Sequence, residues 1–254
     1  LLALRGVTVR FGGVVAVSDL DLQINQGELF SLIGPNGAGK TTVFNLVTGV
    51  YRPSAGSITL DGKSLGRRQP HRITRLGVAR TFQNLRLFSN MSVLENVMVG
   101  ADARHRTSVP GAVLGLPTHR NEERDGQAKA MELLELVGVA SMAGETASNL
   151  SYGDQRRLEI ARALATEPKL LLLDEPAAGM NPAEKVGLQT LVRLIVARGV
   201  TVLLIEHDMS VVMGISDRVA VLDFGRKIAE GPPGVVQRDP VVIAAYLGTP
   251  TDVA

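Results

Sequence analysis

The sequence predicts an α/β fold built around a mostly parallel β-sheet. Three short apolar runs, at 29–33, 170–173 and 202–205, have the length of buried strands. Segments with helical periodicity separate these runs, and strands that alternate with helices are typical of a parallel sheet covered by helices. The 254 residues are enough for one large domain or two small ones, and for a substantial core.

The N-terminal part predicts strands and one helix. Apolar and polar residues alternate at 7–11 and 20–24, which indicates half-buried strands, and a further strand is predicted at 56–60. Residues 41–50 have helical character, and the helix is expected to end at Gly49. A glycine-rich turn links this helix directly to the first buried strand.

The rest of the chain predicts helices around the two remaining buried strands. Helical spacing begins at Val93, recurs at 129–137 and runs again over 152–168. Residues 101–125 are rich in Arg, Gly and Pro, so we expect a variable loop or a short helical insertion there. Residues 218–229 predict a β-hairpin.

Composition narrows the classes of function. The 27 Lys and Arg residues against 25 Asp and Glu residues give a formal charge of +2, too small to indicate a nucleic-acid partner. The absence of cysteine excludes disulfides and thiolate metal sites. No apolar run approaches the roughly 18 residues needed to span a bilayer, and no signal peptide is recognisable. A role at a membrane would therefore need partner subunits.

Residues 34–41 match the phosphate-binding pattern G-x-x-x-x-G-K-[ST] in full, between a predicted strand and a predicted helix. Glycines let backbone N–H groups surround a polyanion, Lys40 is expected to reach the β- and γ-phosphates, and the Thr41 hydroxyl is expected to bind Mg²⁺. An ordinary glycine-rich turn, the alternative, explains neither the complete motif nor its context. ATP and Mg²⁺ are therefore the expected cofactors. The predicted nucleotide contacts here are Gly34, Pro35, Asn36, Gly37, Ala38, Gly39, Lys40, Thr41 and Thr42.

Two adjacent acids follow the buried strand at 170–173. Asp174 is expected beside the metal, and Glu175 beside the attacking water, as general base or as the group that orients it. A solvated strand end is the alternative for such a pair taken alone. The phosphate-binding motif upstream favours the catalytic interpretation, in which the protein contributes positioning and charge stabilisation.

Residues 150–155, Leu-Ser-Tyr-Gly-Asp-Gln, resemble the L-S-G-G-Q signature of the ATPases of ABC transporters, and the resemblance covers essentially the whole chain. It implies a single domain with a P-loop NTPase core, from residues 1–82 and 165–254, that carries an antiparallel β subdomain. It further implies a helical subdomain, containing the signature, at about 83–164.

In the family, this signature binds the γ-phosphate held by the opposing subunit, at a helix N-terminus. Ser151 and Gly153, the positions expected to touch phosphate, are retained, although Tyr152 and Asp154 depart from the commonest signature. The resemblance therefore implies a dimer with a second ATPase subunit and two ATP molecules at the interface. It also implies two transmembrane permease subunits, a substrate-binding protein, and a peripheral location at the cytoplasmic face of a bacterial inner membrane.

Further residues match family positions. Phe11 resembles the aromatic residue that stacks on adenine, with Val17 as a second apolar contact, although Phe11 could instead be a core residue. Gln83 resembles the glutamine that meets the metal and the attacking water. His207 resembles the histidine that contacts the γ-phosphate and holds Glu175 in place. The implied catalytic set is Glu175, His207, Gln83 and Lys40, and the implied metal ligands are Thr41, Gln83 and Asp174.

One residue departs from the family pattern, and one triplet matches a motif of an unrelated family. Asn181 stands where many family members have an acid that helps link the two ATP sites, which bears on communication between the sites and not on hydrolysis. Residues 223–225 spell Asp-Phe-Gly, the metal motif of protein kinases, but the other kinase motifs are absent. We interpret this triplet as the turn of the predicted hairpin.

A narrower resemblance concerns the cargo. Residues 177–182, 204–209 and 212–218 look like the ATPases of bacterial branched-chain amino acid importers, of the type with the larger insertion. Cargo is not recognised by such a subunit, so importers of urea, amides or other amino acids remain alternatives. A lipopolysaccharide exporter is disfavoured by Ala-Ala-Gly-Met-Asn-Pro at 177–182. ATPases of DNA repair or of the ribosome are disfavoured because the chain has no long coiled coil and no tandem copy. Residues 84–88 and the arginine-bearing insertion at 101–125 are the expected candidates for the surface that meets the permeases.

Overall fold

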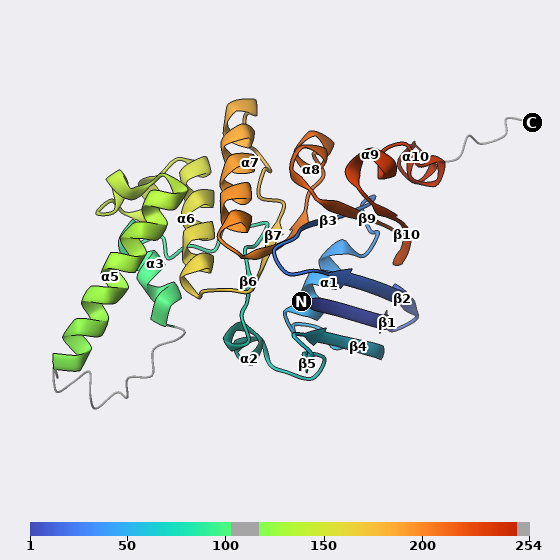
Figure 1. Cartoon of the computed structure of the whole chain (residues 1–254), viewed down its shortest axis with the longest axis horizontal. Coiled ribbons are helices and arrows are strands. Elements are labelled where there is room, and N and C mark those ends of the chain that lie inside the picture. Colours follow the sequence, from blue (N-terminus) through green and yellow to red (C-terminus); the bar gives the residue numbers. More distant parts are fainter. Residues whose placement is uncertain (103–116, 248–254) are drawn as a thin grey trace, which may run out of the picture.

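The computed structural model describes residues 1–102 and 117–247, which form two β-sheets and the helices packed on them (Figure 1). The larger sheet has the strand order β10-β9-β3-β8-β7-β6, and the smaller has the order β2-β1-β4-β5. The larger contains β3 (Leu29–Ile33), β6 (Val78–Arg80), β7 (Leu170–Asp174), β8 (Thr201–Ile205), β9 (Arg218–Asp223) and β10 (Arg226–Gly231). The smaller contains β1 (Leu2–Phe11), β2 (Val14–Ile24), β4 (Ala55–Leu60) and β5 (Lys63–Ser64). This order places β3, which leads into the glycine-rich turn, inside the larger sheet.

The larger sheet is parallel except where β9 meets β10, which confirms the predicted mostly parallel sheet. Every residue of β3, β7 and β8 is buried, since helices and the smaller sheet cover both faces. Burial on both faces explains why these strands are mostly apolar in the sequence, without the alternation of a half-exposed strand.

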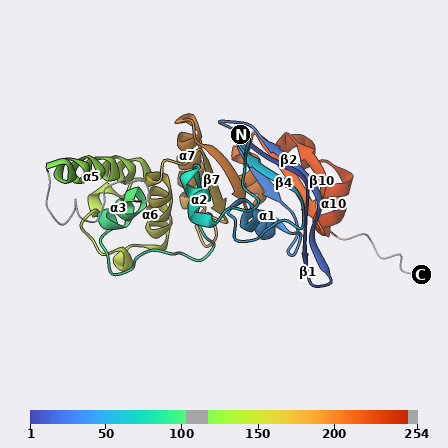
Figure 2. The same ribbon diagram turned by 90° about the horizontal axis from the view of Figure 1, so that it is seen from below.

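The smaller sheet is antiparallel, and much of its length alternates between buried and more exposed residues. Its buried face shares one hydrophobic core with helix α1 (Lys40–Val47) and the larger sheet. Leu4 and Leu22 of the smaller sheet, Phe44 of α1 and Leu32 of β3 all belong to this core. Helix α1 therefore packs against both sheets, with the glycine-rich turn at its N-terminus (Figure 2).

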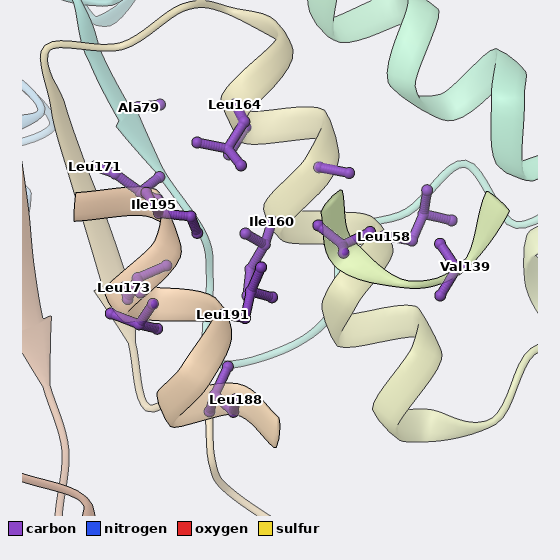
Figure 3. Packing of buried hydrophobic residues seen from close by; sticks show 14 of the residues in the cluster. Ala79, Val139, Leu158, Ile160, Leu164, Leu171, Leu173, Leu188, Leu191 and Ile195 are labelled. Atoms are coloured by element: carbon purple, nitrogen blue, oxygen red, sulfur yellow. The ribbon is translucent and has the colours of Figure 1, made fainter. Parts of the chain in front are cut away.

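Three helices pack against one another at a distance from the smaller sheet: α3 (Val93–Asp102), α5 (Pro117–Val137) and α6 (Tyr152–Ala165) (Figure 1). Helix α7 (Pro182–Ala197) lies between α6 and the larger sheet. Figure 3 shows the shared core, to which α6 contributes Leu158, Ile160 and Leu164, α7 contributes Leu188, Leu191 and Ile195, and β7 contributes Leu171 and Leu173. This packing fixes the start of α6 relative to the end of β7.

The remaining helices are short. α2 (Pro70–Arg75) precedes β6, whereas α8 (Met209–Ile215), α9 (Pro233–Val236) and α10 (Pro240–Leu247) lie beside β9 and β10. Single 3₁₀ turns occupy Ala140–Met142 and Ala147–Asn149. Across the described part of the chain, no helix combines the length and the apolar character needed to cross a membrane.

Most predicted elements are confirmed to within a few residues, including the hairpin at 218–229. The prediction for 101–125 holds only in part. Residues 103–116, with Arg104 and Arg106, lie outside the described residues. From Pro117 onward the chain is the 21-residue helix α5, longer than the short insertion we expected. This segment contains many strong helix formers, Glu, Arg, Gln and Ala, and its last turns are buried against α3 and α6.

Candidate functional site

The glycine-rich turn between β3 and α1 has a shape that requires glycine. Gly39 is the N-cap residue of α1 and has φ 103°, in the left-handed region. A Cβ on Gly34 would lie 2.1 Å from the carbonyl oxygen of Leu222, and one on Gly39 would lie 2.7 Å from that of Ala16. The backbone of the turn is therefore pressed against the two hairpins on either side of it, and its N–H groups are held at the start of α1.

The β9–β10 hairpin braces this turn directly. The N–H of Gly225 donates to the carbonyl of Ala38 at 3.0 Å, and the N–H of Ser18 donates to the carbonyl of Gly225 at 2.8 Å. Phe224, next to it, is 86% exposed and has φ 43°. The Asp-Phe-Gly triplet is thus a hairpin turn, as predicted, and it supports the phosphate-binding loop.

Lys40 lies inside the loop. Its Nζ donates to the carbonyl oxygens of Gly34 at 2.7 Å and Pro35 at 2.9 Å, and the residue is 5% exposed. Burial lowers the pKa of Lys40, while the negative charges of Glu175 and Asp174 raise it. The ammonium therefore lies close enough to both acids at the end of β7 to interact with them electrostatically.

Glu175 is held from two sides. Its Oε1 lies 2.5 Å from Nε2 of His207, and its Oε2 accepts a hydrogen bond from Nε2 of Gln83 at 2.9 Å. Its backbone has φ 48°, an uncommon value for a non-glycine residue, and its N–H donates to the carbonyl of Ile205 at 2.9 Å. Strained backbone of this kind is concentrated at functional sites. Three residues predicted from separate segments thus form one cluster.

A pocket of about 210 Å³ lies between this cluster and the turn. It is lined by Ala16, Asn36, Gly37, Ala38, Gly39, Lys40, Thr41, Thr42, Glu175 and His207. Most of the residues predicted to contact nucleotide therefore surround one cavity, which Glu175 and His207 also line.

The two apolar contacts predicted for adenine differ in their exposure. Phe11 is 45% exposed and meets Tyr51 edge to face, with ring centroids 4.9 Å apart and an interplanar angle of 68°. One face of the Phe11 ring is thus free of that contact. Val17 is fully buried in the core beneath the turn, so its side chain is not available to a base, and the expectation for Val17 is corrected. Ala16 lines the pocket instead.

The signature residues lie at the start of α6, outside this pocket. Ser151 is the N-cap residue: its Oγ accepts from the N–H of Asp154 at 3.2 Å and donates to the Asp154 carboxylate at 2.6 Å. Ser151 is exposed, and a Cβ on Gly153 would lie 3.2 Å from Oε1 of Glu184 in α7. Within the described structure, the signature residues are therefore not among those that line the Lys40 pocket of their own chain.

Asn181, noted above for replacing an acid, begins α7 with a capping box. Its Oδ1 accepts from the N–H of Glu184 at 3.0 Å, and the Glu184 carboxylate accepts from the N–H of Asn181 at 2.8 Å. Both bonds satisfy backbone N–H groups that the helix itself leaves unpaired. The capping box thus gives the loop after Glu175 a fixed end.

Replacing Asn181 by Ala is expected to lower the free energy of unfolding by about 0.5–2 kcal/mol, because one N–H of the first turn of α7 loses its acceptor. Urea unfolding monitored by circular dichroism measures the change. Asn149, which ends a 3₁₀ turn and whose side chain takes part in no described hydrogen bond, provides the matched Asn→Ala control. A loss as large at the control position would contradict the capping account.

Glu206 is a buried residue next to His207 that no sequence motif singled out. It is 3% exposed, and its carboxylate accepts from the N–H of Ala177 at 2.6 Å and from its own neighbour His207 at 3.1 Å. Burial raises the pKa of Glu206, against the effect of these backbone N–H groups. The residue joins the loop after β7 to the loop after β8. In the sequence, the position of this acid directly after the buried strand β8 could have indicated its role.

Asp208 fixes the loop that carries His207. It caps α8 through the N–H groups of Ser210 and Val211, and it pairs with Lys185 of α7 at 2.6 Å. The hydrogen bond from Lys185, followed by that from Ser210, holds the pKa of Asp208 well below its ordinary value of 3.8. An ionised Asp208 therefore stabilises the folded state.

Stability is expected to depend on pH through this residue. Since the folded-state pKa of Asp208 is depressed, its contribution is fully present above its unfolded pKa and is lost as the pH falls through the lower folded value. Asp208→Asn keeps a cap but removes the charge, and should cost about 0.5–1 kcal/mol at neutral pH. Urea titrations of both proteins should show that this difference shrinks below about pH 4. A difference that stays constant into strong acid would contradict the assignment.

The donor set suits a metal bound together with phosphate. No group of three or more His, Cys, Asp or Glu side chains that could hold a metal occurs in the described residues. Mg²⁺ is bound in many phosphate-handling sites by one or two protein oxygens, with phosphate and water completing the shell. Thr41, which lines the pocket, and Asp174, whose charge reaches Lys40, supply oxygens of this kind.

Comparisons with known proteins agree with this geometry. A family model described as ABC transporter matches residues 17–178, and one described as branched-chain amino acid ATP-binding cassette transporter matches residues 226–252. The chain is 48% identical over 249 residues to the high-affinity branched-chain amino acid transport ATP-binding protein LivG of Salmonella typhimurium, covering 98% of each chain.

Solved structures show the same fold. A nucleotide-free ATP-binding cassette from an ABC transporter superposes with a TM-score of 0.85 at 30% identity, covering 98% of this chain and 99% of that one. A dimeric ATP-binding cassette in a post-hydrolysis state, bound to ADP and Pi, gives a TM-score of 0.77 at 25% identity, covering 92% and 99%. The chain therefore belongs to the ABC transporter family, as a nucleotide-binding cassette whose ATPase activity is coupled to transport.

Proposed function

We propose that this cassette powers a bacterial importer of branched-chain amino acids. Two findings support the cargo: the 48% identity to LivG and the match of residues 226–252 to the branched-chain model. The second match also favours this cargo over a lipopolysaccharide exporter. The observation that carries the catalytic part of the proposal is Glu175 held between Gln83 and His207 beside the P-loop pocket.

In the proposed reaction, the backbone N–H groups of the turn and the Lys40 ammonium bind the phosphates of ATP. Thr41 and Asp174, with Gln83, would hold Mg²⁺, which supplies charge neutralisation on the β- and γ-phosphates. Glu175 accepts the proton of the attacking water or orients it. His207 fixes the Glu175 carboxylate and contacts the γ-phosphate.

Each ATP is proposed to lie between two chains. Ser151 and Gly153 sit at the start of a 14-residue helix but not in their own chain's pocket. A helix N-terminus favours phosphate because its N–H groups and dipole are positive. The signature of one subunit would thus complete the site of the other, which is either a related ATPase or a second copy.

The family membership of the chain supports a proposal for the arrangement of the transporter. We assign residues 1–82 and 165–254 to a nucleotide-binding core, with Phe11 stacking on adenine, and about 83–164 to a helical subdomain. Residues 84–88 begin the surface for two permease subunits, which would receive cargo from a substrate-binding protein. The cassette would then be peripheral, at the cytoplasmic face of the inner membrane.

Uptake of labelled leucine by native cells tests the cargo. Deletion of the gene should abolish high-affinity uptake, wild type should restore it, and Lys40→Ala should not, because the phosphates lose their main side-chain cation. Unchanged uptake, in a strain without a redundant importer, would leave the ATPase assignment intact and remove leucine as cargo. Other amino acids, amides and urea would then be tested in the same strains.

A further inference from the structure

A buried arginine outside the motifs described so far contacts Asp174. Arg80 ends β6, and its side chain is only 8% exposed. One guanidinium nitrogen donates to Oδ2 of Asp174 at 2.7 Å, and another donates to Oδ1 of Asn45 in α1 at 2.6 Å. The planar fork of arginine makes both bonds at once, which a lysine cannot reproduce with the same geometry.

Two aromatic rings hold this guanidinium in place. Its central carbon lies 5.3 Å from the ring centre of Phe44 in α1 and 5.0 Å from that of Phe82, next to Gln83. Its Nε is buried and has no hydrogen-bond partner in the described structure. Arg80 therefore connects the P-loop helix, the end of β7 and the Gln83 loop through one rigid group.

The ion pair with Arg80 limits how the Asp174 carboxylate can bind a cation. The carboxylate is 5% exposed, and Oδ2 is engaged by Arg80, while the backbone N–H of Asp174 donates to Oγ1 of Thr81 at 3.3 Å. One oxygen, Oδ1, keeps its full capacity to bind a metal. A positive charge also lies against this carboxylate and opposes the binding of any further cation.

We propose that Arg80 is a positioning residue that makes Asp174 a one-oxygen metal ligand and weakens its hold on the divalent cation. The inference rests on the proposed function in one respect, the role of Asp174 as a metal ligand. A weaker hold would favour release of the metal with the product nucleotide after each turnover, while the ion pair keeps the Asp174 carboxylate in one orientation.

The test is Mn²⁺ binding to the purified full chain in the presence of ADP, followed by electron paramagnetic resonance. Arg80→Gln and Arg80→Met both remove the charge, and two neutral variants guard against one that does not fold. Each is expected to bind Mn²⁺ about tenfold more tightly than wild type, because a cation near the metal has been removed. Steady-state kcat should fall in the same variants, because Asp174 is no longer oriented.

The sign of the change separates this role from a structural one. Damage to the fold would weaken Mn²⁺ and ADP binding together, so tighter Mn²⁺ binding cannot arise from it. Arg86→Met is the matched control, since Arg86 also lies over the Phe82 ring, at 4.5 Å, yet is exposed and does not contact Asp174. Its Mn²⁺ affinity should equal that of wild type, and Arg80→Lys, which keeps the charge, should stay within about twofold.

The Mn²⁺ experiment distinguishes failure of the proposed metal site from failure of the inference about Arg80. If wild type binds Mn²⁺ with ADP but Asp174→Ala binds it equally well, Asp174 is not a ligand and the proposed metal site is wrong. If Asp174→Ala abolishes binding but the neutral Arg80 variants bind Mn²⁺ no more tightly than wild type, the inference about Arg80 is overturned and the proposed metal site stands.

Discussion

Glu175→Gln is expected to lower the steady-state ATPase rate by about 10²–10⁴-fold. The amide is nearly the same size as the carboxylate and can still bond to Gln83 and His207, so the site should keep its shape. It cannot accept the proton of the attacking water. Binding of ATP through the P-loop should be retained, because Glu175 contributes negative charge there and no donor for the phosphates.

Retained binding without turnover should trap the closed dimer. Light scattering with ATP and Mg²⁺ should show association of Glu175→Gln, with the partner ATPase present if the native pair is a heterodimer. Glu135→Gln, an exposed position on α5, is the matched control and should hydrolyse ATP at the wild-type rate. Full activity in Glu175→Gln would remove Glu175 from the reaction. A slow variant that never associates with ATP would instead contradict a site shared between two chains.

The parts of the fold and site that the sequence predicts are those encoded locally. The P-loop is a contiguous motif, and the steric requirement at Gly34 and Gly39 explains why its glycines are recognisable. Strands β3, β7 and β8 are buried on both faces, so each is mostly apolar and lacks the alternation of a half-exposed strand. The hairpin at 218–229 has a turn with positive φ at Phe224 and Gly225, which the Phe-Gly pair signals.

Other parts depend on contacts between distant segments. Arg80 and Asp174 are 94 positions apart, and their ion pair follows only from the pairing of β6 with β7. The burial of Val17 likewise depends on how α1 packs against both sheets. No bounds were predicted for helix α7, although Asn181 followed three residues later by Glu184 is a capping-box signal that could have indicated its start.

The second large effect is expected at Arg156, a fully buried residue of α6. Arg156 pairs with Glu159 at 3.0 Å, and neither side chain is more than 2% exposed. It also donates to the backbone carbonyls of Phe82 and Gln83, while the Glu159 carboxylate accepts from the N–H of Phe82 at 3.2 Å. The helix that begins with the signature thus holds the backbone of the loop whose Gln83 side chain contacts Glu175.

Arg156→Ala is expected to lower the free energy of unfolding by about 3–5 kcal/mol, because it leaves Glu159 buried without its partner. Burial already raises the pKa of Glu159, and Arg156 opposes that rise. Urea unfolding measures the loss. Arg157→Ala is the control: Arg157 is less buried and donates to the carbonyl of Val137 at 3.2 Å, so its loss should cost no more than about 1.5 kcal/mol.

The double variant Arg156→Met with Glu159→Leu separates stability from catalysis. Replacing a buried ion pair by apolar side chains of similar volume is often neutral for stability. This protein should therefore be more stable than Arg156→Ala, and its remaining loss should come from the backbone groups of Phe82 and Gln83 that the pair satisfies. Its ATPase rate should still fall at least tenfold, roughly the cost of misplacing one catalytic group, because the backbone of Phe82 and Gln83 has lost three hydrogen bonds. Wild-type activity in a stable double variant would show that the pair serves the fold alone. Low activity with normal ATP binding would show that the signature helix controls where Gln83 sits against Glu175.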